Sequence, residues 1–139
     1  MKAKTMDDWI KLYEKKTGVK FEPDSRATLK FDPEKGFAEF GVFGNMVVIG
    51  QLSGDAKYWK KLAENLAQQL GLNHLGTWCI RNVEAYIKLF NVEVDMIEEA
   101  GEGLKRYHGH FKDTGKKALL SPRSRNSAGN VVYMVTWEI

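Results

Sequence analysis

A short polar stretch, Gln51-Leu52-Ser53-Gly54-Asp55-Ala56, has the residue types and the setting of an anion-binding site. It follows the apolar run at residues 45–50, which predicts a strand, and precedes residues 57–70, whose composition predicts a helix. Backbone N–H groups in a glycine-containing loop before a helix can bind phosphate oxygens. The spacing therefore predicts a phosphate cradle, and it equally fits a plain strand-to-helix turn with Asp55 as the N-cap.

Other residues with metal-binding or nucleophilic side chains are few. Cys79 is the only cysteine, which excludes an internal disulfide and a cysteine-based metal cluster. His108 and His110 have the spacing of neighbours on one face of a strand, but no third ligand is evident in the sequence. We therefore expect no metal site, a buried structural thiol at Cys79, and a surface or half-buried histidine pair.

The composition is typical of one globular domain. The chain has 139 residues, of which 43% are hydrophobic and 28% charged. It contains no apolar run long enough for a membrane span, and its first residues lack the uninterrupted apolar core of a secretory signal. Together with the single cysteine, these features predict a cytoplasmic protein without a membrane partner.

Positive charge is concentrated toward the C-terminus. From residue 100 onward the chain has seven Lys or Arg and three acidic residues, whereas the first 99 residues have 14 and 15. A basic end of this kind can attract nucleic acid or an acidic protein, although a solvated hairpin surface is the commoner case. The aromatic residues here mostly alternate as in a sheet core, so base stacking is the weaker interpretation; they are Tyr107, Phe111, Tyr133 and Trp137.

The first half of the chain predicts one helix followed by a three-stranded meander. Thr5 is suited to cap the helix, and Gly18 is suited to end it. The Asp-Pro-Glu-Lys-Gly turn favours a hairpin. The predicted elements are a helix over residues 5–17 and strands over residues 27–31, 37–43 and 46–51.

The second half predicts two helices and several strands. The expected elements are helices over residues 55–70 and 81–90, strands over residues 74–80, 104–111, 116–120 and 131–137, an extended segment from Val92, and a loop over residues 123–130. This order indicates an α+β fold with α/β-like character, in which helices flank a mixed, mostly antiparallel sheet. A meander, a helix-strand-helix unit and a C-terminal hairpin form one domain over residues 1–139. A ligand crevice can form where the central strand ends, at Gln51.

Two short motifs resemble those of the GNAT-type N-acetyltransferase superfamily. Gln51-x-x-Gly54-x-Ala56 is similar to the Gln/Arg-x-x-Gly-x-Gly/Ala signature, and Asn82 with Ala85 is similar to the Asn-x-x-Ala start of the family's fourth helix. The element order from about Ala27 onward also resembles the family. The small size and the single N-terminal helix suit a compact member, of the kind found in phages or prophages.

The resemblance implies an acetyl-coenzyme A-dependent transfer to an amine acceptor, either a small molecule or a protein. In the family the signature loop binds the coenzyme pyrophosphate through backbone amides. Carried over to this chain, the resemblance implies that Gly54 allows a close approach of the ligand, with Lys60 and Lys61 adding charge nearby. The cofactor-binding residues that it implies are Gln51, Leu52, Ser53, Gly54, Asp55, Ala56, Lys57 and Asn82.

The catalytic residues match the family less closely. Family members often have a carboxylate on the central strand, but residues 46–50 contain none, so Glu39 on the preceding strand and Asp95 are the candidates for a base. Tyr86 is the candidate thiol-protonating acid, although Asn91-Val92 stands where the family has Gly-Phe.

The N-terminal region is also shorter than in the family, with one helix before the meander. The shorter region is consistent with three alternatives. The protein could have an unusual substrate, or its site could be completed by the second protomer of a homodimer. It could also be a binding protein that has lost catalysis and retains a coenzyme, protein or nucleic-acid partner.

Overall fold

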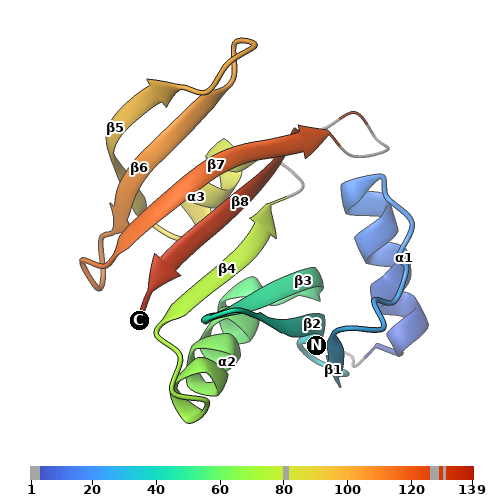
Figure 1. The fold of residues 1–139 in the computed structure, drawn as a ribbon. Coiled ribbons are helices and arrows are strands. Elements are labelled where there is room, and N and C mark those ends of the chain that lie inside the picture. Colours follow the sequence, from blue (N-terminus) through green and yellow to red (C-terminus); the bar gives the residue numbers. More distant parts are fainter. Residues whose placement is uncertain (1–3, 80–81, 126–128, 130) are drawn as a thin grey trace. The chain divides into compact units, whose positions relative to one another are not determined.

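The computed structural model describes residues 4–79, 82–125, 129 and 131–139. The chain divides into two compact units, an N-terminal unit, Met1–Leu75, and a C-terminal unit, Gly76–Ile139. The fold is α+β, as predicted, and the strand pairings within β1–β3 and within β5–β8 are antiparallel. The elements, labelled in Figure 1, are α1 (Met6–Thr17), β1 (Thr28–Asp32), β2 (Gly36–Phe43), β3 (Met46–Gly54), α2 (Ala56–Gln69), β4 (His74–Cys79), α3 (Val83–Leu89), β5 (Val92–Glu99), β6 (Lys105–Phe111), β7 (Lys117–Arg125) and β8 (Val131–Glu138).

Helix α1 begins and ends as its sequence predicts. The Thr5 hydroxyl accepts the N–H of Asp8, and the Asp8 carboxylate accepts the N–H of Thr5, which together form a capping box. Gly18 ends the helix in the left-handed conformation, with a φ of 70°. Trp9 and Tyr13 are buried one turn apart, so this side of the helix packs against the strands.

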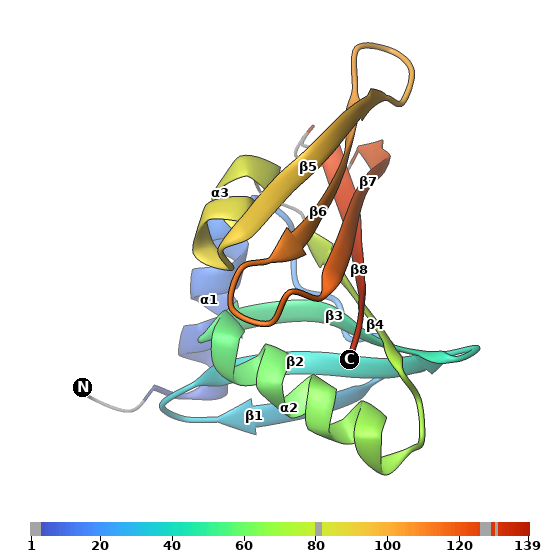
Figure 2. The same cartoon turned by 90° about the vertical axis from the view of Figure 1, so that its left-hand side faces the viewer.

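The meander of β1, β2 and β3 separates the two helices of the N-terminal unit. Successive residues of a strand point to opposite faces, and β2 uses both faces for packing. Phe37 contacts Tyr13 of α1, with ring centroids 5.8 Å apart, and Phe40 contacts Trp59 of α2 at 6.2 Å. Figures 1 and 2 accordingly show α1 and α2 on opposite sides of these strands.

The end of β3 differs from the prediction. The expected strand end at Gln51 is wrong, because β3 continues to Gly54 and its last three residues pair with residues 36–38 of β2. The N–H of Asp55 then donates to the Lys35 carbonyl at 2.9 Å, and α2 begins at the next residue. The strand therefore turns directly into the helix, without the loop that a phosphate cradle requires.

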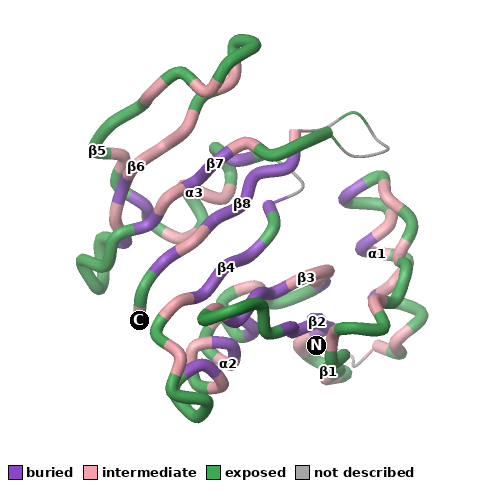
Figure 3. The backbone as a smooth tube through the Cα atoms, in the orientation of Figure 1, coloured by how far each residue is buried: buried purple, intermediate pink, exposed green. Residues whose placement is uncertain are grey.

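The C-terminal unit is built on an antiparallel meander of β5, β6, β7 and β8, and β4 lies next to β8. Its core is apolar and includes Phe111, Ala118, Leu120, Val135 and Trp137. Figure 3 shows that most of β8 is buried. Each predicted extended segment after residue 92 forms a strand. However, β7 extends to Arg125, so Arg123 is in a strand rather than in the expected loop, because a bulge after Pro122 lets Ser124 and Arg125 pair with β8.

The helix predicted over residues 81–90 begins at Val83, with Asn82 as its N-cap. Residues 80 and 81, the predicted last residue of the preceding strand and the first of this helix, lie outside the described residues, as do residues 126–128 and 130 of the expected loop. Asn91, two residues after the end of α3, has a φ of 53°. Asn adopts this left-handed conformation more readily than most residues, so Asn91 can end the helix as glycine would.

The structural role of Gly54 can be tested by measuring how much an alanine at this position lowers stability. A Cβ atom at Gly54 would lie 2.1 Å from the Lys35 carbonyl oxygen, whereas a Cβ at Gly44 would have no atom within 4 Å. The backbone adds to this difference, because the φ of 61° at Gly44 lies in the left-handed region that alanine can adopt at modest cost, whereas the φ of 106° at Gly54 lies outside it. We expect Gly54→Ala to lower the free energy of unfolding by about 3 kcal/mol or more, and Gly44→Ala by about 1 kcal/mol, in urea denaturation. Equal losses for the two variants would contradict the structural role of Gly54.

Candidate functional site

The N-terminal unit contains a buried carboxylate, Glu39, which is only 3% exposed. Glu39 lies two residues after Phe37 in β2, so both side chains face α1. One carboxylate oxygen accepts the backbone N–H of Asp24 at 2.9 Å, and the other accepts the side-chain amide of Gln51 at 2.8 Å. The structure thus brings together two of the residues singled out in the sequence, Glu39 and Gln51.

A β-bulge explains this contact. The register of β2 and β3 changes from Ala38 opposite Leu52 to Phe40 opposite Ile49. Glu39 therefore faces two residues of β3, Gly50 and Gln51, instead of one. The extra residue lets Gln51 lie on the face of Glu39 together with Ser53, whereas simple alternation counted from Ile49 would place it on the opposite face.

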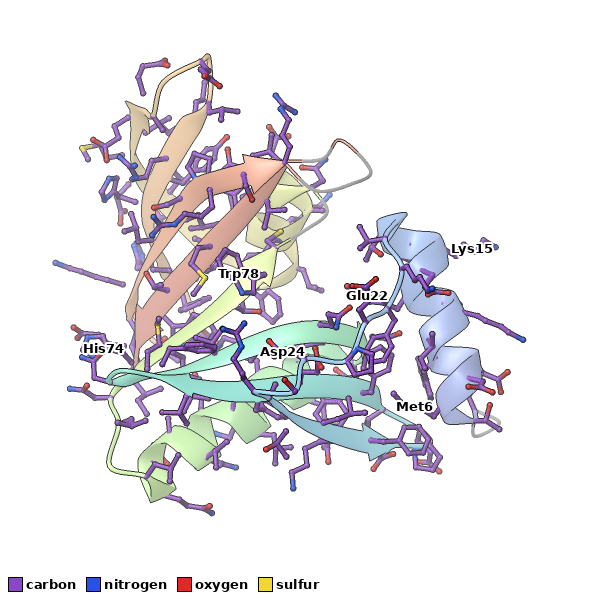
Figure 4. All side chains as sticks on the ribbon, turned by 45° about the vertical axis from the view of Figure 1, so that its right-hand side comes forward. Met6, Lys15, Glu22, Asp24, His74 and Trp78 are labelled. Atoms are coloured by element: carbon purple, nitrogen blue, oxygen red, sulfur yellow. The ribbon has the colours of Figure 1, made fainter. Side chains whose placement is uncertain are left out.

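Gln51 also holds the segment over residues 19–25, which connects α1 to β1 and is named the strap here. Its side-chain oxygen accepts the N–H of Glu22 at 3.2 Å, and its side-chain nitrogen donates to the Glu22 carbonyl. On the same strap, the N–H of Phe21 donates to the Glu14 carboxylate at 2.8 Å. Figure 4 labels Glu22 and Asp24, which lie on the strap on the α1 side of the strands.

Aromatic rings surround this side of the strands. Phe21 of the strap lies 5.0 Å from Phe37 and 6.1 Å from Tyr13, measured between ring centroids. Burial raises the pKa of Tyr13 to about 12, and the negative charges of Glu39 and Glu14 add to this effect. Tyr13 therefore stays protonated at neutral pH and lies within the electrostatic field of Glu39.

Most residues of the expected phosphate cradle, residues 51–56, make contacts within the protein. The Ser53 hydroxyl donates to the carbonyl of Trp9 at 2.9 Å, and Gly54 is packed against the backbone of Lys35. Asp55 caps α2, since its carboxylate accepts the N–H of Tyr58 at 3.1 Å and lies 3.5 Å from the Lys35 ammonium. The strand residues of the cradle thus do not fit a pyrophosphate.

Two backbone N–H groups at the start of α2 remain suited to bind an anion. In any α-helix the N–H groups of the first turn have no intrahelical acceptor. Those of Asp55 and Tyr58 are bound as described, which leaves the N–H groups of Ala56 and Lys57 at the start of α2. Lys57 also brings a positive charge to this end of the helix. The part of the cradle that fits a phosphate group is therefore Ala56 and Lys57.

Asn82 and Tyr86 form a separate group in the C-terminal unit. The Asn82 side chain accepts the N–H of Glu84 at 2.9 Å and so caps α3, the helix that carries Tyr86. The Tyr86 ring is half-buried and packs on Phe90, with centroids 4.6 Å apart. These contacts account for Asn82 as a helix cap and for the Tyr86 ring as a packing residue.

One face of β5 and β6 carries acid–base pairs that the sequence analysis did not identify. Glu98 lies 3.1 Å from Arg106 and 2.7 Å from His108, and Asp95 lies 2.9 Å from His110. His108 and His110 are half-buried, as expected. The acidic residues of β5 alternate against the basic residues of β6, and this cross-strand pattern was the signal available in the sequence.

The charges of these pairs shift each other's pKa values. Hydrogen bonds from His108 and then Arg106 hold the pKa of Glu98 below its usual value. The hydrogen bond to Asp95, supported by the charges of Asp95 and Glu93, raises the pKa of His110 above 6.5. Asp95, a candidate base in the sequence, is therefore the partner of a histidine on the neighbouring strand.

Neither a metal centre nor a membrane helix is found in the part of the chain that the structure describes. No group of three or more His, Cys, Asp or Glu side chains there is arranged to hold a metal ion. No described helix is both long enough and apolar enough to cross a membrane.

Comparisons with protein-family models, with curated proteins and with solved structures found no match to this chain.

The His110–Asp95 pair predicts a pH-dependent contribution to stability. A raised pKa in the folded state means that this contribution is complete below about pH 6.5 and is lost as the pH rises through the raised pKa. We expect the thermal unfolding midpoint of the wild type to fall more between pH 6 and pH 8 than that of Asp95→Asn. Asp113→Asn, in the turn after β6, is the control for the charge change and should keep the wild-type pH dependence. Identical pH profiles for all three proteins would show that the pair does not contribute.

Proposed function

We propose that this chain is a GNAT-like N-acetyltransferase that uses acetyl-coenzyme A and an amine acceptor. The observation that carries the proposal is the buried Glu39 carboxylate on the strand pair that ends at the start of α2. The order of the elements, with a meander, a helix, a strand, a helix and closing strands, supports it. The resemblance of Gln51-x-x-Gly54-x-Ala56 to the family signature adds further support.

The donor would be bound at the start of α2. The N–H groups of Ala56 and Lys57 can donate to one phosphate group, and the Lys57 side chain can add a positive charge. When bound, the coenzyme supplies an acetyl thioester. Glu39 faces Gln51, five residues before Ala56, which corresponds to about 17 Å along an extended strand. An extended pantetheine arm can cover a separation of this order.

The acceptor would be activated by Glu39. An amine reacts as the neutral base, so a residue of the protein must take a proton from its ammonium form. The Glu39 carboxylate has an oxygen that can hold this proton, in surroundings from which water is largely excluded. Tyr86 is proposed as the proton donor to the leaving thiolate, on the resemblance of its helix to that of the family.

A second candidate function is binding without catalysis. Both carboxylate oxygens of Glu39 are already hydrogen-bonded within the protein, and the Asp55 carboxylate occupies the N-terminal end of α2. These contacts favour a protein that keeps a GNAT-like arrangement and binds coenzyme A, a protein or a nucleic acid. A nucleic-acid partner would act through the basic residues after residue 100, and its binding would weaken steeply with salt.

A proline at residue 56 tests the donor site. Ala56 is the first residue of α2, where proline is well tolerated but removes the N–H group. We expect Ala56→Pro to bind coenzyme A about tenfold more weakly in calorimetry, the loss of one hydrogen bond to a charged group. Met6→Pro makes the same change at the first residue of α1 and should leave the affinity unchanged. An unchanged affinity in Ala56→Pro would exclude this N–H group as a phosphate ligand.

Thiol release with a panel of amines tests catalysis. We expect Glu39→Gln to lower kcat by a factor of about 10² to 10⁴, as for the loss of a general base, without weakening coenzyme A binding. Tyr86→Phe should lower kcat as well, because it removes the proposed proton donor to the leaving thiolate. Full activity in Glu39→Gln would reject the base assignment. Coenzyme A binding by the wild type without thiol release from any amine would favour the second candidate.

A further inference from the structure

Glu39 is a buried carboxylate without a positive partner. No ion pair joins it to a Lys, Arg or His side chain within the described ranges, residues 4–79, 82–125, 129 and 131–139. Arg26, which is near in sequence to the strap, pairs with the Asp24 carboxylate at 3.3 Å instead. Burying a carboxylate is costly, and hydrogen bonds offset this cost less completely than a cation would. The site therefore has an unmatched negative charge.

The surroundings of Glu39 suit an organic cation. Tyr13, Phe21 and Phe37 form a cluster of three rings on the same side of the strands. Aromatic rings attract ammonium groups through their negative faces and bind apolar groups by burial. The hydroxyl of Tyr13 remains neutral at physiological pH.

The strap that covers Glu39 is held mainly by side chains. Between residues 20 and 23, the backbone hydrogen bonds run from Phe21 to Glu14 and between Glu22 and Gln51. The next bond joins the N–H of Asp24 to Glu39 itself. A segment held by a few bonds of this kind can open locally at a small fraction of the cost of global unfolding. A cation that reaches Glu39 would take the place of the Asp24 N–H.

We propose that Glu39 and the rings of Tyr13 and Phe37 bind a primary ammonium ion carried on an apolar group, and that the strap, with the Phe21 ring, is displaced when this ligand enters. Gln51 is a positioning residue, because its amide holds both the carboxylate and the strap. The identification of this ligand as the acceptor amine rests on the proposed function. The binding itself requires no coenzyme.

Calorimetry with 2-phenylethylammonium chloride, without coenzyme A, tests the site. The neutral analogue 2-phenylethanol has a similar shape and no charge, so it should bind at least tenfold more weakly. Glu39→Gln keeps the size and an acceptor oxygen but removes the charge, and it should lose at least tenfold in ammonium affinity. Glu14→Gln is the matched control, since it makes the same charge change at another contact of the strap, and it should bind like the wild type.

Three results would overturn the proposal. These are no binding of the ammonium ion by the wild type at millimolar concentration, equal affinity for the neutral alcohol, and an equal loss in Glu39→Gln and Glu14→Gln. Hydrogen exchange tests the strap, because the amides of Glu22 and Asp24 should exchange faster in the bound protein. Binding with unchanged exchange at both amides would refute the displacement.

The failure of this inference can be distinguished from the failure of the proposed function. Coenzyme A binding and thiol release that persist without ammonium binding at Glu39 would leave the transferase proposal intact and refute this site. Ammonium binding that depends on Glu39, in a protein that does not bind coenzyme A, would support the site and refute the transferase.

Discussion

The N-terminal unit depends on one polar contact, the hydrogen bond between the Gln51 amide and the Glu39 carboxylate. The bulge in β3 makes this contact by placing two residues opposite Glu39. The same amide then reaches the backbone of Glu22 and holds the strap against the strands. If this contact were lost, the buried Glu39 carboxylate would have one hydrogen bond fewer. Apolar contacts nearby could not offset the resulting loss of stability.

Most of the secondary structure could be predicted from the sequence because its signals are local. The capping box of α1, the apolar side of α2 and the turn before β2 each depend on residues within a few positions of one another. The end of β3 could not be predicted in this way. It is set by residues 36–38, which lie about sixteen residues earlier in the chain and extend the pairing to Gly54.

The candidate site shows the same division between local and distant signals. Asp55 could be predicted as a helix cap, because a cap depends only on the residues that follow it. Glu39 and Gln51 were each identified from the sequence, but in separate roles, since their contact depends on a bulge that no local pattern indicates. The pairs between β5 and β6 were missed because the register of those strands sets them.

The hydrogen bonds of Gln51 to Glu22 have a consequence for how the strap can vary. The Gln51 carboxamide accepts a hydrogen bond from the N–H of Glu22 and donates one to its carbonyl. A residue of a neighbouring strand makes the same pair of hydrogen bonds in an antiparallel sheet. The side chain of Gln51 recognises only the main chain of the strap, and the side chain of Glu22 is exposed. The amino acid at position 22 is thus free to diverge in sequence while the strap keeps its attachment, whereas position 51 is confined to a side chain with a terminal amide of this length.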